Sequence, residues 1–259
     1  MSSAFDLTGR AALVTGAGSP TGIGFATARL LAEMGAALIV TSTTDRIDDR
    51  VSELRATGAE VFGIVGDLTD PVTATHLVDS AMKHWGRLDV VVQNAGMTSV
   101  SGPEKSAALE DMDFAMWRAS ISRNLDTTFF VAKACLPGMK AAGWGRLVLV
   151  SSLTGPVMAT KGEPAYAAAK SGMVGLARSL ALNVASHGVT VNAVAPGWIE
   201  TGSQTPQEFQ EGLKTPMGRS ARPEEVASEI CWLASPGASY VTGQCLIVDG
   251  GNSIAEERA

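Results

Sequence analysis

Cysteine and histidine are scarce in this sequence, with three of each in 259 residues. Cys135, Cys231 and Cys245 lack Cys-x-x-Cys spacing and lie in apolar stretches, so we expect buried, reduced thiols rather than disulfides or a zinc site. The histidines are scattered without the paired spacing of metal ligands, and we expect them at the surface or at helix ends. The sequence therefore predicts no metal centre.

Long apolar runs and basic clusters are missing as well. No stretch of about 18 consecutive apolar residues occurs, so the sequence predicts no membrane-spanning helix. Residues 1–10 contain no basic segment followed by an apolar one, which favours the cytoplasm over export. The net charge is −6 and no run of Lys or Arg is present, so we expect neither nucleic acid nor an anionic membrane as a partner.

Glycine and apolar residues, in contrast, are abundant, at 28 residues and 46% of the chain. Short apolar runs that predict buried strands alternate with longer segments whose apolar residues recur at helical spacing. The predicted strands are 11–14, 36–40, 60–65, 88–93, 146–150, 190–194 and 246–248, and the predicted helices are 25–34, 45–56, 72–85, 114–139, 166–186 and 223–233. This alternation predicts an α/β fold: a doubly wound parallel sheet of about seven strands with helices on both faces, in one domain over residues 1–259.

A glycine-rich turn connects the first predicted strand to the first predicted helix. It contains Gly16, Gly22 and Gly24. A turn without side chains lets the backbone approach a pyrophosphate, and the N-terminus of the helix presents free N–H groups to it. Alone, such glycines can simply make a turn, but the strand-turn-helix context favours dinucleotide binding.

Polar and small residues follow the ends of the predicted strands. They are Gly16, Thr43, Asp67, Asn94, Ser152 and Pro196-Gly197. In doubly wound sheets ligands bind in the crevice beyond the carboxyl ends of the strands. We therefore expect these residues to line one site.

Tyr166 and Lys170 are spaced four apart in a predicted helix, so their side chains share one face. A phenol with a pKa near ~10 is a poor acid-base catalyst at neutral pH, but a neighbouring ammonium stabilises the phenolate and lowers that pKa. The pair taken alone is a weak signal. Together with the strand-end residues it predicts an acid-base centre.

Several motifs in the same order resemble those of the classical short-chain dehydrogenase/reductase family, over Leu7 to Asn252. They are Tyr166 and Lys170 as Tyr-x-x-x-Lys, Ser152, Asn94-Ala95-Gly96, Asn124 on the long predicted helix, the segment Pro196-Gly197-Trp198-Ile199-Glu200-Thr201, and Val248-Asp249-Gly250-Gly251. The sequence looks most like the 3-oxoacyl-acyl-carrier-protein reductase type. The resemblance implies a Rossmann fold and hydride transfer between a nicotinamide and a carbonyl or alcohol carbon, with a 3-oxoacyl thioester or another apolar ketone as substrate.

The resemblance also implies roles for four residues. Tyr166 passes the proton, Ser152 hydrogen-bonds the carbonyl oxygen, Lys170 lowers the Tyr166 pKa and holds the cofactor ribose, and Asn124 orders a water. Ser152 as a strand-end cap and Asn124 as a helix residue bonding the backbone are the structural alternatives. The spacing from Ser152 to Tyr166 is one residue longer than the family pattern, so Ser151 stays open as the catalytic serine.

The cofactor site implied by the resemblance is larger. It comprises Gly16, Ser19, Thr21, Gly22, Ile23, Gly24, Ser42, Thr43, Arg46, Asp67, Leu68, Asn94, Ala95, Gly96, Tyr166, Lys170, Pro196, Gly197, Ile199 and Thr201. Five residues, Ala17 to Thr21, separate Gly16 from Gly22, which makes this turn two residues longer than the family pattern. Asp67 can instead cap the next helix.

The end of the second strand bears on the choice of cofactor. NAD-selective folds place an acidic residue there to bind the ribose 2′-OH, and Ser42 occupies that position. Hydroxyls of this strand end and the cation of Arg46 favour a 2′-phosphate, whereas Asp45 opposes it and Thr21 replaces a basic residue of many NADP enzymes. We predict NADP(H) in preference to NAD(H).

The substrate is expected among Met97, Thr154, Met158 and Trp198, with a small lid around residues 202–217.

Small residues on the Tyr166 helix permit close packing of helices. The resemblance implies that this helix forms a subunit face of a homotetramer or homodimer. The competing functions are a non-catalytic redox sensor or scaffold, sugar-nucleotide epimerisation and enoyl reduction. The complete Ser-Tyr-Lys-Asn set argues against a non-catalytic sensor or scaffold. The short C-terminal portion leaves little room for a nucleotide-sugar domain, and the Tyr-to-Lys spacing argues against enoyl reduction.

Overall fold

The computed structural model describes residues 4–96, 98–99, 102–103 and 105–256. The strands are β1 (Ala11–Val14), β2 (Ala37–Ser42), β3 (Val61–Val65), β4 (Val90–Gln93), β5 (Thr98–Ser99), β6 (Gly102–Pro103), β7 (Gly145–Val150), β8 (Val189–Pro196) and β9 (Cys245–Val248). The α-helices are α1 (Ile23–Glu33), α2 (Arg46–Ala56), α3 (Pro71–Trp85), α4 (Phe114–Ile121), α5 (Thr127–Ala142), α6 (Pro164–Val184), α7 (Pro206–Leu213) and α8 (Pro223–Ala234).

Seven of the described strands form a parallel sheet in the order β3-β2-β1-β4-β7-β8-β9. All residues of β1, β4, β7 and β8 are buried, as expected for strands that are covered on both faces. The chain order reverses beside β1, where β4 follows on the side opposite β2. The predicted doubly wound α/β fold is confirmed.

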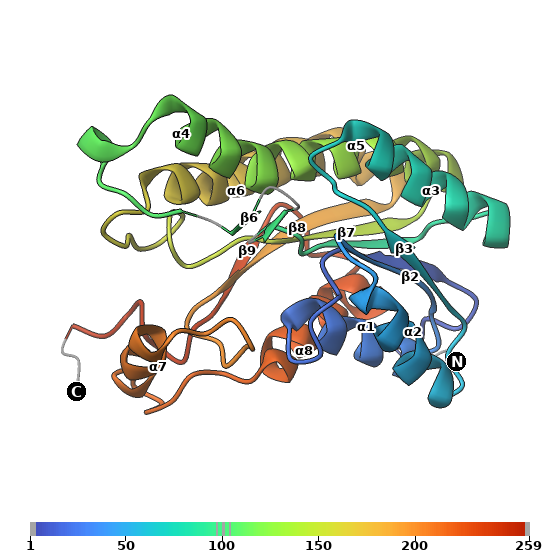
Figure 1. Ribbon diagram of the computed structural model, residues 1–259. Coiled ribbons are helices and arrows are strands. Elements are labelled where there is room, and N and C mark those ends of the chain that lie inside the picture. The colour runs from blue at the N-terminus through green and yellow to red at the C-terminus, as the bar shows by residue number, and fades with distance from the viewer. Residues whose placement is uncertain (1–3, 97, 100–101, 104, 257–259) are drawn as a thin grey trace.

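Two helical layers cover the sheet, as Figure 1 shows with α3, α5 and α6 on one face and α1, α2 and α8 on the other. Each layer has its own apolar core. One core joins α1, α2 and α8 to the sheet through residues such as Phe25, Ile47 and Ile230. The other joins α3, α5 and α6 through residues such as Leu77 and Met139. Burial of these side chains holds the helices against the sheet. The polar residues that follow the strands are thereby held in fixed positions.

The helix predicted over 114–139 is interrupted, which corrects the sequence-based expectation. A π-helical turn at Ser122–Asp126 separates α4 from α5. Within it the Asn124 Nδ2 donates to the Ser120 carbonyl at 3.1 Å, and the Thr128 hydroxyl donates to the Asn124 carbonyl at 2.8 Å. Side-chain bonds of this kind compete with the regular helical ladder, and π-turns of this length recur at functional sites.

Two short elements flank the crevice. The antiparallel pair of β5 and β6 was not predicted from the sequence. Helix α7 lies within the predicted lid and is held at its start by a reciprocal capping box between Thr205 and Glu208. The lid segment is thus structured by its own local sequence.

At the amino-terminal ends of the strands, opposite the crevice, a buried carboxylate links the segments that lead into β1 and β4. Asp89, which is 2% exposed, accepts hydrogen bonds from Arg10 at 2.9 Å, from Arg87 at 2.6 Å and from the Ala11 N–H at 2.9 Å. Burial by itself raises the pKa of Asp89, but the bonds from Arg87, Ala11 and Arg10 outweigh burial and hold the pKa below its usual value. The ionised form is therefore the one that stabilises the fold.

Replacement of Asp89 by Asn is expected to lower the free energy of unfolding at pH 7 by about 2–4 kcal/mol, because two arginines lose their buried partner. Since the folded pKa of Asp89 is depressed, its contribution is present above the unfolded value near ~3.9 and is lost as the pH falls toward the folded value. The deficit should therefore shrink below pH ~4. Urea unfolding at a series of values between about pH 3 and 7 measures this difference in the free energy of unfolding. Replacement of the exposed Asp111 by Asn is the control. A difference for Asp89→Asn that is independent of pH would contradict the expectation.

Candidate functional site

The glycine-rich turn is locked to the end of β4. The Asn94 Nδ2 donates to the carbonyls of Thr15 and Gly16, both at 3.1 Å. A Cβ on Gly24 would lie 2.5 Å from the Gly16 oxygen and 2.6 Å from the Asn94 Nδ2. Glycine at 24 is therefore required for the close approach of α1 to the turn, and Asn94 acts here as a structural clamp.

The N-terminus of α1 fits a phosphate group. Gly22 is the N-cap, no side chain caps the helix, and no acidic residue lies in its first turn. The leading N–H groups of an uncapped helix carry a partial positive charge and bind anions. The turn residues beside it are Ser19, whose carbonyl accepts from the Gly22 N–H at 3.2 Å, and the exposed Thr21. Ile23 opens the helix.

Basic and hydroxyl groups meet at the end of β2. The Ser42 Oγ accepts a long hydrogen bond from the Arg46 Nε at 3.4 Å, and a Cβ on Gly18 would lie 2.6 Å from that hydroxyl. The Arg50 Nη1, one helical turn further on, donates to the Gly18 carbonyl at 3.4 Å. Thr43 lies half-buried beside them. This corner of the crevice thus carries two guanidinium groups.

Asp67 does not cap α3, because Asp70 is the N-cap and accepts from the Val72 N–H at 2.9 Å. The Asp67 Oδ1 instead accepts from the Thr69 N–H and hydroxyl at 2.9 and 2.8 Å. Leu68 is buried beneath it, at the carboxyl edge of β3. The helix-cap alternative for Asp67 is therefore wrong.

Lys170 lies at the centre of the crevice with its ammonium group buried, the residue being 4% exposed. Its Nζ donates to the Val150 carbonyl at 3.0 Å and lies 5.5 Å from the centre of the Tyr166 ring. A Cβ on Gly96 would lie 3.4 Å from this Nζ and 2.7 Å from the Asn124 Oδ1. Lys170, Tyr166, Asn124 and Gly96 are therefore brought together, although they come from three segments of the chain.

The two serines after β7 have different surroundings. Ser151 is buried and its hydroxyl donates to the Lys170 carbonyl at 2.9 Å. Ser152 is half-buried and its hydroxyl accepts from the Thr154 N–H at 3.1 Å. The Ser151 hydroxyl thus ties α6 to the sheet, whereas the Ser152 hydroxyl keeps its own proton to donate.

The segment after β8 is held between its neighbours. The Pro196 carbonyl accepts from the Leu153 N–H at 2.9 Å, and the Gly197 N–H donates to the Val248 carbonyl at 2.9 Å. A Cβ on Gly197 would lie 2.9 Å from the Asp249 Cβ. Beyond it, the Thr201 N–H donates to the Ile199 carbonyl at 2.8 Å, which turns the chain toward the lid.

The substrate side of the crevice collects residues from three loops. Thr154 forms a bridge with Met158, whose sulfur accepts from the Asn252 Nδ2 at 3.8 Å. The lid reaches the C-terminal turn, since a Cβ on Gly250 would lie 3.4 Å from Met217. Trp198 is half-buried in the segment between them. Met97, which the sequence also places here, lies outside the described residues.

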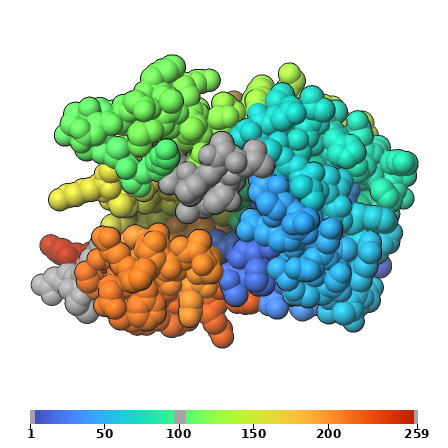
Figure 2. Space-filling model, viewed as in Figure 1, coloured from blue at the N-terminus to red at the C-terminus, as the bar shows by residue number. Residues whose placement is uncertain are grey.

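Figure 2 shows this side as a hollow between the orange segment that holds α7 and the green and yellow helical layer above it. The lid also reaches across to the phosphate end of the crevice, because a Cβ on Gly202 would lie 2.7 Å from the Thr21 hydroxyl. The two extra residues of the glycine-rich turn therefore bring Thr21 against the start of the lid. Both segments are predicted from the sequence, but the contact between them is not.

Three contributors were missed in the sequence. Thr15 is fully buried, and its hydroxyl accepts from the N–H groups of Asn94 and Ala95, both at 3.0 Å. Arg50 and Asn252 reach the crevice from α2 and the C-terminal turn. The spacing of Arg46 and Arg50, four apart on a predicted helix, was the signal that could have revealed Arg50. Asn252 had no local signal because tertiary packing brings it to Met158.

Comparison with known proteins agrees with this geometry. A family model described as Enoyl-(Acyl carrier protein) reductase matches residues 16–253. Cis-4-hydroxycyclohexanecarboxylate dehydrogenase of Sinomonas cyclohexanicum is 43% identical, over 93% of this chain and 96% of that protein. The 3-oxoacyl-acyl-carrier-protein reductase of Pseudomonas aeruginosa is 38% identical, over 95% and 98%, and an oxidoreductase of Escherichia coli is 37% identical, over 96% and 97%.

The chain belongs to the short-chain dehydrogenase/reductase family. It is accordingly an oxidoreductase that uses a nicotinamide cofactor and acts on hydroxyl or carbonyl groups. The described residues include no group of three or more His, Cys, Asp or Glu placed to hold a metal ion. None of the helices in that part of the chain is both long and apolar enough to cross a membrane.

Replacement of Gly96 by Ala is expected to lower kcat on the order of 10–100-fold, because the new Cβ would lie 2.7 Å from the Asn124 Oδ1 and would displace that side chain beside Lys170. Gly138→Ala in α5 is the matched control, since a Cβ there meets nothing within 4 Å. That control is expected to keep its activity and to gain helix stability. Steady-state kinetics with circular dichroism to verify folding check the pair, and equal kcat values in both variants would contradict the expectation.

Proposed function

We propose that the protein is an NADP(H)-preferring ketoreductase in which Ser152, Tyr166, Lys170 and Asn124 carry the chemistry. The observation behind this is the buried Lys170 ammonium, placed 5.5 Å from the Tyr166 ring and packed with Asn124 against Gly96. A cation buried at 4% exposure requires compensation. The Val150 carbonyl supplies part of it, and stabilisation of a neighbouring phenolate gives the cation a catalytic use.

In reduction, a nicotinamide cofactor held in the crevice would supply the hydride for the carbonyl carbon. The Ser152 hydroxyl donates a hydrogen bond to the carbonyl oxygen, where negative charge develops. The Tyr166 hydroxyl gives that oxygen its proton, which completes the alcohol, and Lys170 stabilises the phenolate left behind. Asn124, whose side chain lies against Gly96, is proposed to order a water for return of the proton.

The cofactor preference is supported by the corner at the end of β2. Arg46 bonds Ser42 there, and Arg50 bonds the Gly18 carbonyl while its guanidinium also pairs with Glu53, so Arg46 is the cation proposed for the phosphate and no carboxylate stands at position 42. A 2′-phosphate forms strong, charge-assisted hydrogen bonds with guanidinium groups. Asp67 with Leu68 is proposed for the adenine, and Ala95, Gly96, Pro196, Gly197, Ile199 and Thr201 for the nicotinamide half.

Apolar and cyclic ketones are the proposed substrates. The relatives act, by their names, on a cyclohexane hydroxy acid and on 3-oxoacyl thioesters. Thr154, Met158 and Trp198 supply an apolar wall with few polar groups. Enoyl reduction is not favoured, because Ser152 and the Tyr166-to-Lys170 spacing suit a carbonyl oxygen. A non-catalytic sensor would have no need for this acid-base set.

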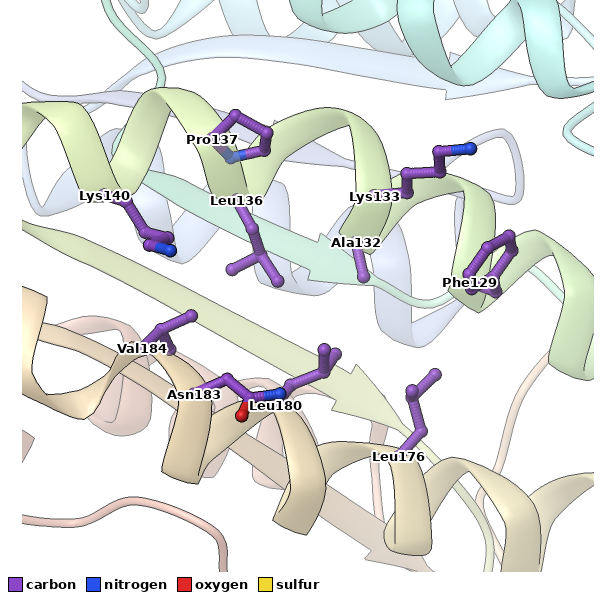
Figure 3. Close-up of a pocket in the computed structure, with 10 residues that line it drawn as sticks. All are labelled: Phe129, Ala132, Lys133, Leu136, Pro137, Lys140, Leu176, Leu180, Asn183 and Val184. Carbon is purple, nitrogen blue, oxygen red and sulfur yellow. The ribbon is translucent and has the colours of Figure 1, made fainter.

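A homotetramer or homodimer is proposed, with the whole of 1–259 as one cytoplasmic domain and residues 202–217 as its lid. A groove of about 510 Å³ lies between α5 and α6, and its lining is Phe129, Ala132, Lys133, Leu136, Pro137, Lys140, Leu176, Leu180, Asn183 and Val184. Figure 3 shows Leu136 and Leu180 pointing toward each other across it. Of the small residues of α6, Ala169 and Ala177 are buried within the chain, whereas the exposed Gly175 leaves room for the close packing of a second subunit. A monomer in sedimentation velocity would refute the assembly.

Replacement of Tyr166 by Phe is expected to lower kcat/KM by about 10²–10⁴-fold, because the proton donor is lost while the ring stays in place. Oxidation of NADPH with acetoacetyl thioesters, cyclohexanone and aryl ketones measures it, and fluorescence titration verifies that the cofactor still binds. Ser152→Ala and Ser151→Ala separate the two serines. A larger fall in kcat for Ser151→Ala would contradict the assignment of Ser152.

Replacement of Arg46 by Ala is expected to raise the KM for NADPH about tenfold and to leave the KM for NADH unchanged, since only the phosphate loses a charged donor. Arg29→Ala is the matched control, because that exposed arginine pairs with Glu224 far from the β2 corner. The ratio of kcat/KM for the two cofactors reports the preference. A wild-type ratio above tenfold (about 1.4 kcal/mol) in favour of NADH would overturn it.

A further inference from the structure

Two residues that are far apart in the sequence meet beside the phosphate end of the crevice. A Cβ on Gly202, at the start of the lid, would lie 2.7 Å from the Thr21 hydroxyl and 3.8 Å from the Ser19 hydroxyl. Ser19 in turn lies beside the N-terminus of α1, because a Cβ on the N-cap residue Gly22 would lie 3.1 Å from the Ser19 Cβ. The start of the lid therefore contacts the turn directly at the uncapped end of α1.

Burial shows which side of the crevice this contact covers. Ala17 and Gly24 are buried, and the Ala17 N–H donates to the Thr41 carbonyl at the end of β2 at 2.9 Å. These residues form the floor of the turn against the sheet. Thr21 and Gly202 are both exposed. Their contact therefore lies on the solvent side, opposite the floor.

The lid behind this contact is braced as one unit. Its two ends are paired, since the Glu200 N–H donates to the Ala221 carbonyl at 2.8 Å. Inside it, the Gln204 Nε2 donates to the hydroxyl of the buried Ser220 at 2.8 Å. A Cβ on Gly212 would overlap that same hydroxyl, so α7 is packed closely on Ser220. Separation of Gly202 from Thr21 therefore requires the lid to shift as a body.

We propose that the contact between Thr21 and Gly202 is a latch, which covers the cofactor diphosphate and must open for the cofactor to bind and to leave. The inference rests on the proposed cofactor site at the glycine-rich turn. A diphosphate at the N-terminus of α1 lies between the buried floor and the exposed latch. The added length of the turn supplies the latch, because it carries Thr21 out to the lid. Exchange of cofactor is therefore tied to movement of the lid.

A disulfide across the latch tests this in the Thr21→Cys/Gly202→Cys double variant. The Thr21 hydroxyl oxygen is one bond from its Cβ, so Cβ atoms at positions 21 and 202 lie about 4 Å apart, within the ~3.5–4.5 Å that a disulfide spans. Mild oxidation of the folded protein is expected to form this bond, and peptide mass mapping identifies it. Absence of the crosslink in the folded protein would overturn the proposed contact.

The rates of cofactor exchange are then compared in the oxidised and the reduced forms of this one variant. Stopped-flow fluorescence measures the association of NADPH, and displacement by excess NADP⁺ measures the dissociation of NADPH that was loaded before oxidation. Both rate constants are expected to fall at least about tenfold in the oxidised form and to recover when dithiothreitol reduces the bond. Equal rate constants in the two forms would overturn the proposal.

The single variants Thr21→Cys and Gly202→Cys are the matched controls, because neither can form the crosslink. Oxidation is expected to leave the exchange rates of each unchanged. The native thiols are present in every variant, with Cys135 and Cys231 buried and Cys245 partly buried. A wild-type protein that binds neither NADPH nor NADH would instead refute the proposed cofactor site. Binding that is insensitive to the crosslink would refute the latch alone.

Discussion

The site depends on a reciprocal pair of hydrogen bonds between the end of β7 and α6. The Lys170 Nζ donates to the Val150 carbonyl at 3.0 Å, and the Ser151 hydroxyl donates to the Lys170 carbonyl at 2.9 Å. Both bonds are buried, where an unmade bond would be most costly. Helix and strand are therefore held in one register. Tyr166, one turn earlier on α6, and Ser152, directly after Ser151, take their positions from this pair.

The second constraint is the π-turn that carries Asn124. The Asn124 side chain binds the Ser120 carbonyl at the end of α4, and the Thr127 and Thr128 hydroxyls bind the Arg123 and Asn124 carbonyls of the turn. A Cβ at position 96 would lie 2.7 Å from the Asn124 Oδ1, so glycine at 96 leaves the space that the Asn124 side chain occupies.

The cofactor end of the crevice is organised by close backbone packing. Gly24 and Gly16 allow α1 to approach β4, and Asn94 bridges both carbonyls of the turn. The same approach exposes the uncapped N-terminus of α1 at the crevice. The lid then meets the enlarged turn through Gly202 and Thr21. The glycine-rich turn and the start of the predicted lid segment are thus packed against each other.

The sequence by itself determined the fold class and the candidate residues, because buried strands, amphipathic helices and strand-end glycines leave periodic and local patterns. Tyr166 with Lys170 was readable for the same reason, since helical spacing alone places them on one face. The π-turn escaped, because it arises when side chains compete with the ladder, and so did the contacts of Arg50, Asn252 and Gly202. The tertiary structure alone decided the π-turn, these contacts and the different surroundings of Ser151 and Ser152. The physical reason is that each of these features depends on which distant segments pack together and on which polar atoms that packing buries.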